Sequence, residues 1–229
     1  MSASAMERGD FARFRRKLLV LGATGGTGRA LVEQARQRGH LVTAFVRSPE
    51  KLGEPREGVS VIRGDPRDAE ALRAVLPGHD AVLSALGPSG LGPTTLVSDC
   101  ARSTVKAMQA TGVRRLLVVG VAVLFESDGF LNAIARRTFL RNVARDSAEM
   151  ERIVSASGLD WTIARPPRLT NGALTRAYGV ADARMPPAAR LTISRADVAD
   201  FLLEEVEHPT HVDRIVGLAA VKVAARRAS

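Results

Sequence analysis

The stretch Lys17-Leu18-Leu19-Val20-Leu21-Gly22-Ala23-Thr24-Gly25-Gly26-Thr27-Gly28 runs from an apolar strand pattern straight into a glycine-rich turn. An amphipathic helical pattern follows over residues 29–38, and a second apolar run occupies residues 41–46. Glycines let a backbone approach a phosphate closely, and the free N–H groups of a helix N-terminus face its negative charge. These segments form a strand–helix–strand unit of about 30 residues, which predicts the first dinucleotide-binding unit of a Rossmann-type fold.

The glycines at positions 22, 25 and 28 are spaced G-x-x-G-x-x-G. That spacing alone fits a simple tight turn between a strand and a helix as well as it fits a phosphate site, but the flanking strand and helix patterns favour the phosphate site. Arg29 is a further candidate for phosphate contact. We expect the turn to bind the cofactor through Gly22, Thr24, Gly25, Gly26, Thr27 and Gly28.

Arg47 and Ser48 follow the second strand pattern, at the point where a site that prefers NAD carries an acidic residue. An acidic side chain there would repel a 2′-phosphate, whereas a guanidinium beside a hydroxyl binds it through charge-assisted hydrogen bonds. Arg47 and Ser48, together with Lys51, therefore predict NADP(H) as the cofactor. The alternative is a solvated arginine at the end of a strand.

The composition is that of one globular domain, with 229 residues and 45% hydrophobic content. Residues 1–16 are polar, rich in arginine and without a secretory signal pattern, so we expect a disordered extension before a domain over 17–229. No apolar run is long enough to span a membrane, and we expect no membrane partner. The single cysteine, Cys100, excludes an internal disulfide and a cysteine metal site, and a cytoplasmic location fits.

The net charge of +9 suggests an acidic partner, yet the basic residues are scattered along the chain and only 4% of residues are aromatic. A nucleic-acid interface usually gathers its basic residues into a patch or stripe. We therefore expect no specific nucleic-acid partner. The charge is assigned to an arginine-rich surface that attracts anionic small molecules.

Strand and helix patterns alternate along the rest of the chain. Strand patterns lie at 59–62, 80–86, 115–120, 160–164, 191–193 and 213–218. Helical patterns lie at 68–76, 94–110 and 132–157, and another begins at Ser194 with a capping-box-like start. This alternation predicts an α/β fold with a doubly wound parallel sheet of Rossmann type in a single domain.

Ligands of such sheets bind beyond the carboxyl ends of the strands. Besides the glycine turn, this rule singles out as cofactor-binding residues Asp65, Pro66, Leu86, Gly87, Gly120, Val121 and Pro166. Asp65 is placed either to accept a hydrogen bond from the adenine amino group or to cap the helix that follows it. Residues 170–189 are expected to form part of the wall around a small-molecule substrate.

Several motifs together resemble the atypical short-chain dehydrogenase/reductase group, and within it NmrA-like proteins of the biliverdin-IXβ reductase/flavin reductase kind. The matching segments lie between residues 17 and 218 and include Gly22-Ala23-Thr24-Gly25-x-Thr27-Gly28, Pro93-Thr94-Thr95, Leu174-Thr175-x-Ala177-Tyr178 and Ile193-Ser194-x-x-Asp197. The resemblance implies an NADPH-dependent oxidoreductase that passes a hydride to a planar acceptor, such as a flavin, a quinone, a bilin or a polyketide-like carbonyl. It also favours a monomer over a dimer.

The chain departs from this family at the expected catalytic groups. The family's serine after the fifth strand falls at Val121 and its histidine at Arg168. The tyrosine–lysine pair of other short-chain dehydrogenases is absent, since Asp182 stands four positions after Tyr178. Transfer to a flavin or quinone asks less of the protein, because the acceptor spreads the charge and water supplies the proton. Tyr178 and Arg168 are the candidate catalytic residues, with packing and surface exposure as their respective alternatives.

The remaining polar residues give weaker indications. The acids in the loop after the fifth strand are expected to be solvated: Glu126 and Asp128. The histidines fall at element ends, so we expect surface roles for His40, His79, His208 and His211. Pro209 prevents the last two from forming a helical metal pair, and we expect no metal.

Two further functions stay open alongside the reductase. Val121 and Arg168 also fit an NADP-binding, NmrA-like regulator or interaction protein without turnover. The other alternative is an isomerase or epimerase that retains its NADP.

Overall fold

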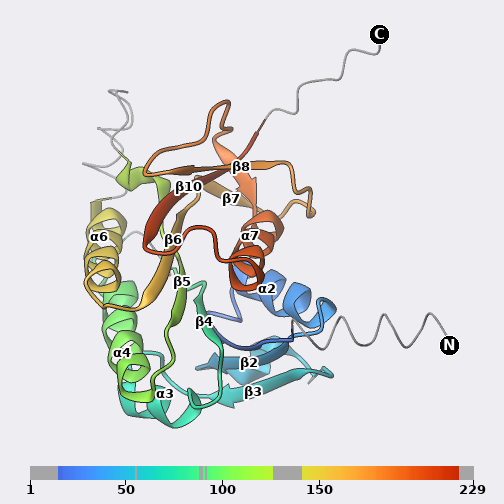
Figure 1. Cartoon of the computed structure of the whole chain (residues 1–229), viewed down its shortest axis with the longest axis vertical. Helices are drawn as coiled ribbons and strands as arrows, with labels where there is room; N and C mark the ends of the chain where they lie inside the picture. Colours follow the sequence, from blue (N-terminus) through green and yellow to red (C-terminus); the bar gives the residue numbers. More distant parts are fainter. Residues whose placement is uncertain (1–14, 55, 88–89, 91, 126–140, 222–229) are drawn as a thin grey trace, which may run out of the picture.

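Figure 1 shows the computed structural model of the chain, which describes residues 15–54, 56–87, 90, 92–125 and 141–221. Strands and helices alternate in it as the sequence predicts. Their order is β1 (Lys17–Leu21), α2 (Gly26–Gln37), β2 (Leu41–Val46), η1 (Pro49–Leu52), β3 (Val59–Arg63), α3 (Ala69–Val75), β4 (Ala81–Ser84), α4 (Leu96–Thr111), β5 (Arg115–Val119), η2 (Ala122–Leu124), α6 (Arg141–Ser155), β6 (Asp160–Arg165), β7 (Arg168–Thr170), β8 (Tyr178–Asp182), β9 (Thr192–Ser194), α7 (Arg195–Glu207) and β10 (Arg214–Ala220), where η marks a 3₁₀ helix.

The main sheet has eight strands in the order β3-β2-β1-β4-β5-β6-β10-β8. Its neighbouring strands are parallel, except that β8 runs antiparallel to β10 at one edge. The first six strands stand in the order typical of Rossmann dinucleotide-binding domains. The predicted doubly wound parallel sheet is therefore confirmed, and β7 and β9 form a separate parallel pair.

Side chains of the central strand β1 point alternately to the two faces of the sheet, and both faces are buried. Leu18 and Val20 pack with α2 and α7 on one face, while Leu19 and Leu21 pack with α3, α4 and α6 on the other. Figure 1 shows these two helical layers on opposite sides of the sheet. Burial on both faces explains why the parallel strands read as continuous apolar runs.

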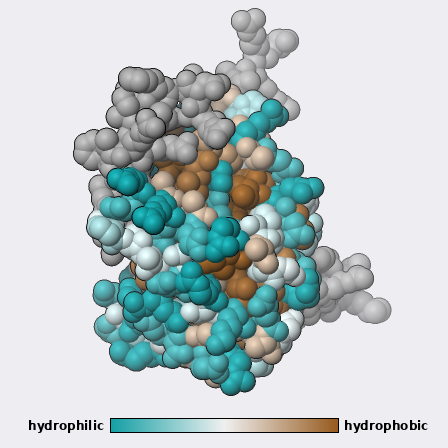
Figure 2. All heavy atoms as spheres, turned by 90° about the vertical axis from the view of Figure 1, so that its left-hand side faces the viewer, coloured by the Kyte–Doolittle hydropathy of each residue, from teal (hydrophilic) through white to brown (hydrophobic). Residues whose placement is uncertain are grey.

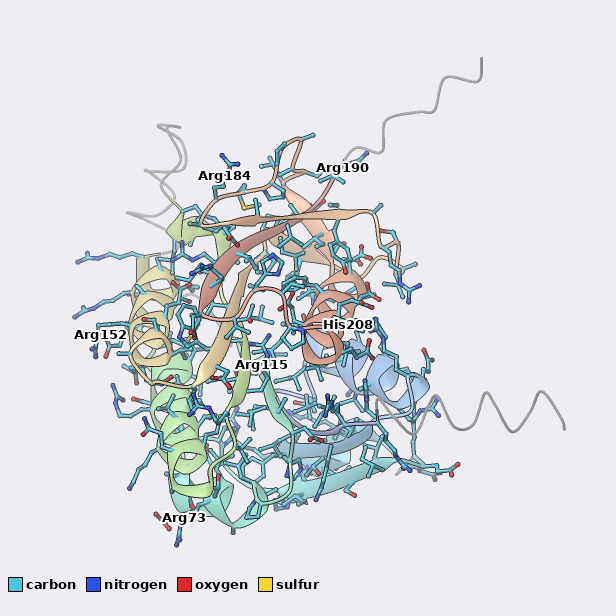
Figure 3. All side chains as sticks on the ribbon, in the orientation of Figure 1. Arg73, Arg115, Arg152, Arg184, Arg190 and His208 are labelled. Atoms are coloured by element: carbon cyan, nitrogen blue, oxygen red, sulfur yellow. The ribbon has the colours of Figure 1, made fainter. Side chains whose placement is uncertain are left out.

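The arginines are dispersed over the molecule, as their scatter along the chain suggests. Figure 3 shows Arg73, Arg152, Arg184 and Arg190 at the periphery, whereas Arg115 lies inside, with Nη2 3.3 Å from a Glu205 carboxylate oxygen. On the face that carries α4 and α6, hydrophilic side chains surround apolar patches (Figure 2). Within the described ranges, no helix is both long and apolar enough to cross a bilayer.

Strands β7 and β8 are not indicated by the sequence patterns. β8 is a five-residue strand at the edge of the sheet, and its pairing with β10 stabilises its extended conformation. The helix expected over 132–157 is described from Arg141 onward, as α6. Residues 1–14 of the expected extension lie outside the described residues, while the Arg16 main-chain N–H donates to His40 Nδ1 at 3.2 Å.

The order of strands reverses between β1 and β4, because the chain runs outward from β1 through β2 to β3 before it crosses back to β4. Connections that leave these two strands in opposite directions open a crevice at their carboxyl ends, the usual ligand position in such sheets. The glycine turn follows β1 there, and Ala85 and Leu86 follow β4.

Candidate functional site

The glycine turn after β1 is packed so closely that two of its glycines have no room for a side chain. Gly22 has a φ of 79°, and a Cβ at this position would come within 2.7 Å of the Ala85 carbonyl oxygen. A Cβ at Gly28 would collide with the Gly22 carbonyl oxygen. The Gly25 N–H donates to that same oxygen at 3.0 Å and closes the turn. The turn thereby brings the start of α2 against the ends of β1 and β4.

The N-terminus of α2 lacks the groups that usually satisfy a helix start. Gly25 occupies the N-cap position, no side-chain capping bond forms within the described part of the chain, and the first turn carries no acidic residue. Its N–H groups and the positive end of the helix dipole are therefore available to an anion. This arrangement fits the diphosphate of a dinucleotide.

Two neighbouring cavities extend from this turn along the strand ends. The larger, of about 160 Å³, runs past Asp65 and Gly87, and the smaller, of about 90 Å³, runs past Ser48 and Lys51. Of the predicted cofactor residues, these cavities bring together Gly22, Thr24, Gly25, Arg47, Ser48, Asp65, Pro66, Leu86 and Gly87.

Other predicted residues do not line the two cavities. Thr27 and Gly28 are buried at the start of α2, next to Gly26. Gly120, Val121 and Pro166 belong to the loops after β5 and β6. For all six of these residues, contact with a cofactor stays a prediction.

The cavity walls also include residues that the sequence motifs do not indicate as cofactor contacts, namely Phe45, Val46, Ala85, Leu96 and Cys100. Most are apolar, and only their position at strand ends or beside the crevice could have indicated them. Burial raises the pKa of the Cys100 thiol to about 12, so this thiol stays protonated and unreactive near neutral pH.

Arg47, Ser48 and Lys51 border the smaller cavity just beyond β2. Arg47 is exposed, and no described carboxylate lies within ion-pair distance of it. Arg29, considered as a phosphate contact, braces this region instead: its Nε donates to the Thr24 carbonyl oxygen at 3.1 Å and its Nη2 to that of Lys51. Arg29 thus ties the glycine turn to the segment that carries Lys51.

Asp65 faces the larger cavity and is oriented by Arg67. Arg67 Nε donates to Asp65 Oδ1 at 3.1 Å, and Nη2 donates to Oδ2 at 2.6 Å. These hydrogen bonds, more than any other influence, hold the pKa of Asp65 below its usual value. The alternative role for Asp65, capping the next helix, is wrong: Asp68 caps α3, because its Oδ1 accepts from the N–H groups of Glu70 and Ala71, each at 3.0 Å.

The loops after β5 and β6 lie side by side. The Gly120 N–H donates to the Ala164 carbonyl oxygen at 2.7 Å, and the Ala122 N–H donates to that of Pro166 at 2.9 Å. Val121 stands between the two donors and has an aliphatic side chain. The position of the family's serine therefore carries no proton donor.

A buried ion pair supports these loops. Arg165 Nε, at the end of β6, donates to Glu151 Oε1 of α6 at 3.0 Å. The same guanidinium lies 4.6 Å from the centre of the Phe125 ring, in the segment after β5. The pair fixes the ends of β5 and β6 against α6.

Tyr178 is engaged outside the two cavities. Its hydroxyl donates to Asp200 Oδ2 at 2.8 Å, and its ring packs edge-on against Phe201 with centroids 6.4 Å apart. Burial, together with the hydrogen bond to Asp200, raises the pKa of the Tyr178 phenol above its usual value. Asp200 is also held by Arg38 at 2.6 Å. This placement favours packing, the alternative to a catalytic role.

Arg168 begins β7 with its side chain exposed. In the part of the chain that the structure describes, no carboxylate pairs with it, so its role toward a substrate stays a prediction. The loop acids Glu126 and Asp128 lie outside the described residues.

Two of the motifs that carry the family resemblance hold the expected substrate wall. Asp197, buried on α7, accepts hydrogen bonds from the N–H of Thr175 at 2.7 Å, from Thr175 Oγ1 at 2.9 Å and from the N–H of Arg176 at 2.8 Å. Ser194 Oγ accepts from the Asp197 N–H at 2.9 Å, which confirms the predicted helix start. The segment 170–189 is thereby tied to α7.

Two histidines expected on the surface, His40 and His79, are buried instead. His40 Nε2 lies 2.8 Å from Glu207 Oε1. His79 Nε2 lies 2.8 Å from Thr43 Oγ1, and Nδ1 lies 3.1 Å from the Leu76 carbonyl oxygen. The expectation is wrong because polar partners, some of them distant in sequence, satisfy the rings and allow their burial.

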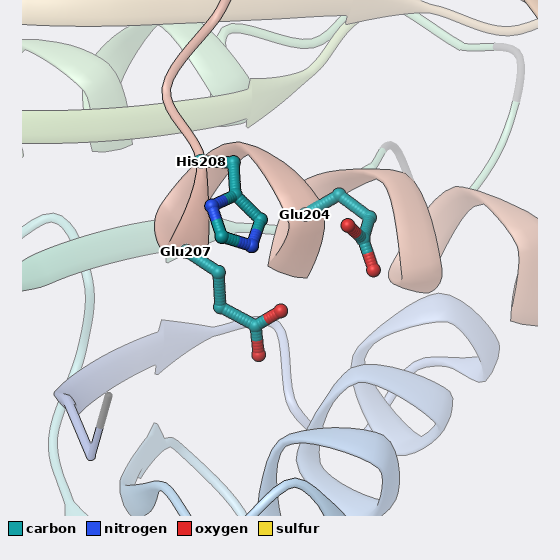
Figure 4. Close-up of side chains that lie close together, drawn as sticks. All are labelled: Glu204, Glu207 and His208. Atoms are coloured by element: carbon teal, nitrogen blue, oxygen red, sulfur yellow. The ribbon is translucent and has the colours of Figure 1, made fainter. Parts of the chain in front are cut away.

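Glu204, Glu207 and His208 come together at the end of α7 (Figure 4), each with a potential ligand atom within 4.8 Å of the others. A metal would have to compete with Arg38, whose Nη1 donates to Glu204 Oε1 at 2.9 Å and to Glu207 Oε2 at 2.8 Å. Burial raises the pKa of Glu207, but His40 and Arg38 outweigh it and hold this pKa below its usual value. We assign Glu204 and Glu207 to an ion-pair network with Arg38 that joins the end of α2 to α7.

Known proteins resemble this chain over most of its length. A profile of the family described as NAD(P)H-binding matches residues 22–209. A (4-alkanoyl-5-oxo-2,5-dihydrofuran-3-yl)methyl phosphate reductase of Streptomyces griseus is 32% identical over 166 residues, which cover 72% of this chain and 52% of the relative.

Two solved structures extend the comparison. A protein of Streptococcus pneumoniae provisionally assigned as an NADH-flavin reductase is 28% identical with a TM-score of 0.73, covering 90% of this chain and 99% of that one. A protein of Bacteroides thetaiotaomicron provisionally assigned as an epimerase is 26% identical with a TM-score of 0.78, covering 92% and 100%. With its Rossmann sheet, glycine turn and crevice, the chain belongs to the NAD(P)H-binding family.

Proposed function

We propose that the chain is an NADPH-dependent oxidoreductase that transfers a hydride to a planar acceptor: a flavin, a quinone, a bilin or a polyketide-like carbonyl. The crevice at the β1/β4 switch point carries this proposal. It joins a helix N-terminus open to an anion with Arg47, Ser48 and Lys51 on the β2 side. On the other side of the switch point lie β5 and β6, and Val121 belongs to the loop after β5.

The residues of the crevice fit the parts of NADPH in order along the sheet. The start of α2 and the turn before it suit the diphosphate, and Asp65 suits the adenine amino group. Arg47, Ser48 and Lys51 suit the 2′-phosphate, because a guanidinium, a hydroxyl and an ammonium all donate hydrogen bonds to it. Since no described carboxylate neutralises Arg47, its charge is available to the cofactor. The proposal therefore specifies NADPH over NADH.

When bound, NADPH supplies the hydride, while the chain binds and orients the two rings. Val121 offers no proton donor, and the Tyr178 hydroxyl is engaged by Asp200. An ordinary ketone becomes an alkoxide and needs a positioned acid. A flavin or quinone spreads the charge over a conjugated ring and takes its proton from water, so such acceptors suit this site better.

Arg168 and the segment 170–189 are the proposed substrate contacts. Arg168 stands two residues after Pro166, and its exposed guanidinium is suited to stabilise negative charge on a reduced acceptor. The reductase names of two relatives support reduction, and the flavin reductase assignment of the Streptococcus pneumoniae protein supports a planar acceptor.

A second candidate is an NADP-binding protein without turnover. The aliphatic Val121 at the position of a family catalytic residue favours it. A third candidate is an isomerase or epimerase that retains its NADP. The epimerase assignment of the Bacteroides thetaiotaomicron protein supports it.

Binding and consumption of NADPH separate these candidates. The purified chain is titrated with NADPH, and NADPH oxidation is then followed with riboflavin, FMN and a quinone. The proposal predicts saturable binding and continuous oxidation with at least one acceptor. Tight binding without consumption would support the second candidate, and binding followed by isomerisation of a sugar substrate without net oxidation would support the third.

A further inference from the structure

Arg195, the first residue of α7, extends its side chain to the glycine turn. A Cβ at Gly26 would come within 2.5 Å of Arg195 Cδ and 2.8 Å of Arg195 Nε, so the arm of this arginine lies directly on the Gly26 backbone. Gly26 is the first residue of α2. No local sequence pattern singles out Arg195, because only the packing of α7 beside α2 brings the two residues together.

This contact puts a positive charge at the positive end of α2. A cation beside a helix N-terminus is unfavourable by itself, because the exposed N–H groups and the helix dipole are already positive there. The first turn of α2 has no acidic residue, and no described carboxylate lies within ion-pair distance of Arg195. Its Nη1 donates to the neutral Asn171 Oδ1 at 2.7 Å, which orients the guanidinium without neutralising it.

An anion at the start of α2, within reach of the Arg195 guanidinium, would relieve this repulsion. The arm of Arg195 packs on Gly26, which leaves the residue only partly exposed and holds its guanidinium close to the start of α2. Membership in the NAD(P)H-binding family identifies the anion, because the cofactor carries a diphosphate and glycine turns at helix N-termini hold it.

We propose that Arg195 is a cofactor-binding residue that closes the diphosphate site from the side of α7, with Asn171 as its positioning residue. The inference rests on the proposed function only in requiring that the chain binds NADP(H). It adds α7 to a site that the start of α2 and the carboxyl ends of β1 to β4 otherwise build.

The same contact gives Gly26 a specific purpose. A methyl group there would displace the Arg195 arm, whereas alanine is otherwise a better helix residue than glycine. G26A should therefore leave the cofactor-free chain at least as stable as wild type and still weaken cofactor binding. If displacement of Arg195 is the cause, the losses of G26A and R195M are not additive in the double variant.

The test compares the Kd of NADP⁺ with that of 2′-AMP, which has the 2′-phosphate but no diphosphate, by calorimetric titration of the full chain. R195M should raise the Kd of NADP⁺ by about 10- to 100-fold through loss of charge-assisted hydrogen bonds. It should leave the Kd of 2′-AMP within about twofold, and R195K should recover part of the loss. R190M, which removes an exposed arginine at the periphery (Figure 3), should change neither Kd by more than about twofold.

Thermal unfolding of the cofactor-free variants shows whether they fold. R195M should melt at or above the temperature of wild type, because it removes a cation from the positive end of α2. An unchanged Kd of NADP⁺ in R195M would overturn the inference while the proposed function stands, provided that wild type binds NADP⁺. Failure of wild type to bind NADP⁺ would contradict the proposed function itself.

If that unchanged Kd is accompanied by a raised KM for an anionic acceptor, the guanidinium acts at the substrate. One other result would overturn the role of Arg195 toward the diphosphate: an equal loss of NADP⁺ and 2′-AMP binding, which would indicate a general change in the crevice.

Discussion

Replacing Arg47 with alanine tests whether the end of β2 selects the cofactor. The Arg47 side chain is exposed, lines both cavities and pairs with no carboxylate among the described residues. Its removal breaks no ion pair, so the free energy of unfolding of R47A should stay within about 0.5 kcal/mol of wild type. Any change in cofactor binding then reports on the ligand and not on the fold.

The expected size of the change follows from the chemistry of the contact. A hydrogen bond to a charged group contributes about 1.5–3 kcal/mol net. At about 1.4 kcal/mol per tenfold, the loss of one such bond raises the Kd of NADPH by about 10- to 150-fold. NADH has no 2′-phosphate, so its Kd should change by less than about threefold. The preference for NADPH over NADH should fall accordingly.

The assay is a titration of both reduced cofactors, followed by their fluorescence, against wild type, R47A and R63A. Arg63 ends the neighbouring strand β3 and lies outside the two cavities. Its side chain is 70% exposed, and its Nη2 lies 3.4 Å from Glu50 Oε2. R63A therefore removes the same charge one strand away. Equal weakening of NADPH and NADH by R47A, or an equal effect of R63A on NADPH, would refute the assignment of Arg47 to the 2′-phosphate.

Three predictions concern the scaffold around the crevice. Glu151→Gln leaves the Arg165 guanidinium buried without its counter-charge, so the free energy of unfolding measured in urea should fall by about 3 kcal/mol. The control, Glu149→Gln, removes an exposed ion pair and should lower it by less than about 0.5 kcal/mol. Equal losses in the two variants would contradict this prediction. Burial, above all, holds the pKa of His79 below its usual value, so the folded state takes up this proton less readily than the unfolded state. The free energy of unfolding should therefore decrease as the pH drops below about 6.5, and His79→Gln should remove the contribution of His79 to this decrease. An unchanged pH dependence in the variant would be inconsistent with this prediction. Asp197→Ala removes the acceptor of three hydrogen bonds and should cost about 2–3 kcal/mol of unfolding free energy, whereas a loss below about 0.5 kcal/mol would show that these bonds do not hold the wall.

The strands inside the sheet are predictable from sequence, because a strand covered on both faces is apolar throughout. The run over β1 shows this, since Leu18, Leu19, Val20 and Leu21 are all fully buried. The edge strand β8 is not predictable in this way. It is short and only partly buried, and β9 and α7 separate it along the chain from its partner β10.

The cofactor end of the site is predictable for a different reason. The glycine turn and Arg47 belong to one strand–helix–strand unit, so their spacing along the chain fixes their proximity in space. Arg195 meets Gly26 only through the packing of two helices, and His40 meets Glu207 in the same way. No local pattern encodes such contacts.

Tyr178 shows the opposite limit of a sequence motif. The motif that contains Tyr178 is one of those that resemble the reductase family, and the phenol of Tyr178 is the group that could act as a proton donor. The structure gives that hydroxyl to Asp200, beside the aromatic contact with Phe201. The motif thus predicts the position of the residue along the fold but not the partner of its hydroxyl.

Hydride transfer from NADPH to a planar acceptor is tested by anaerobic oxidation of NADPH with FMN, using NADPH deuterated at C4 on one face at a time. If the crevice holds the cofactor as proposed, the rate saturates in both substrates and only one of the two deuterated forms shows a primary isotope effect, because the nicotinamide is held in one orientation. Saturable binding of NADPH with no oxidation by FMN, riboflavin or a quinone would contradict the reductase assignment.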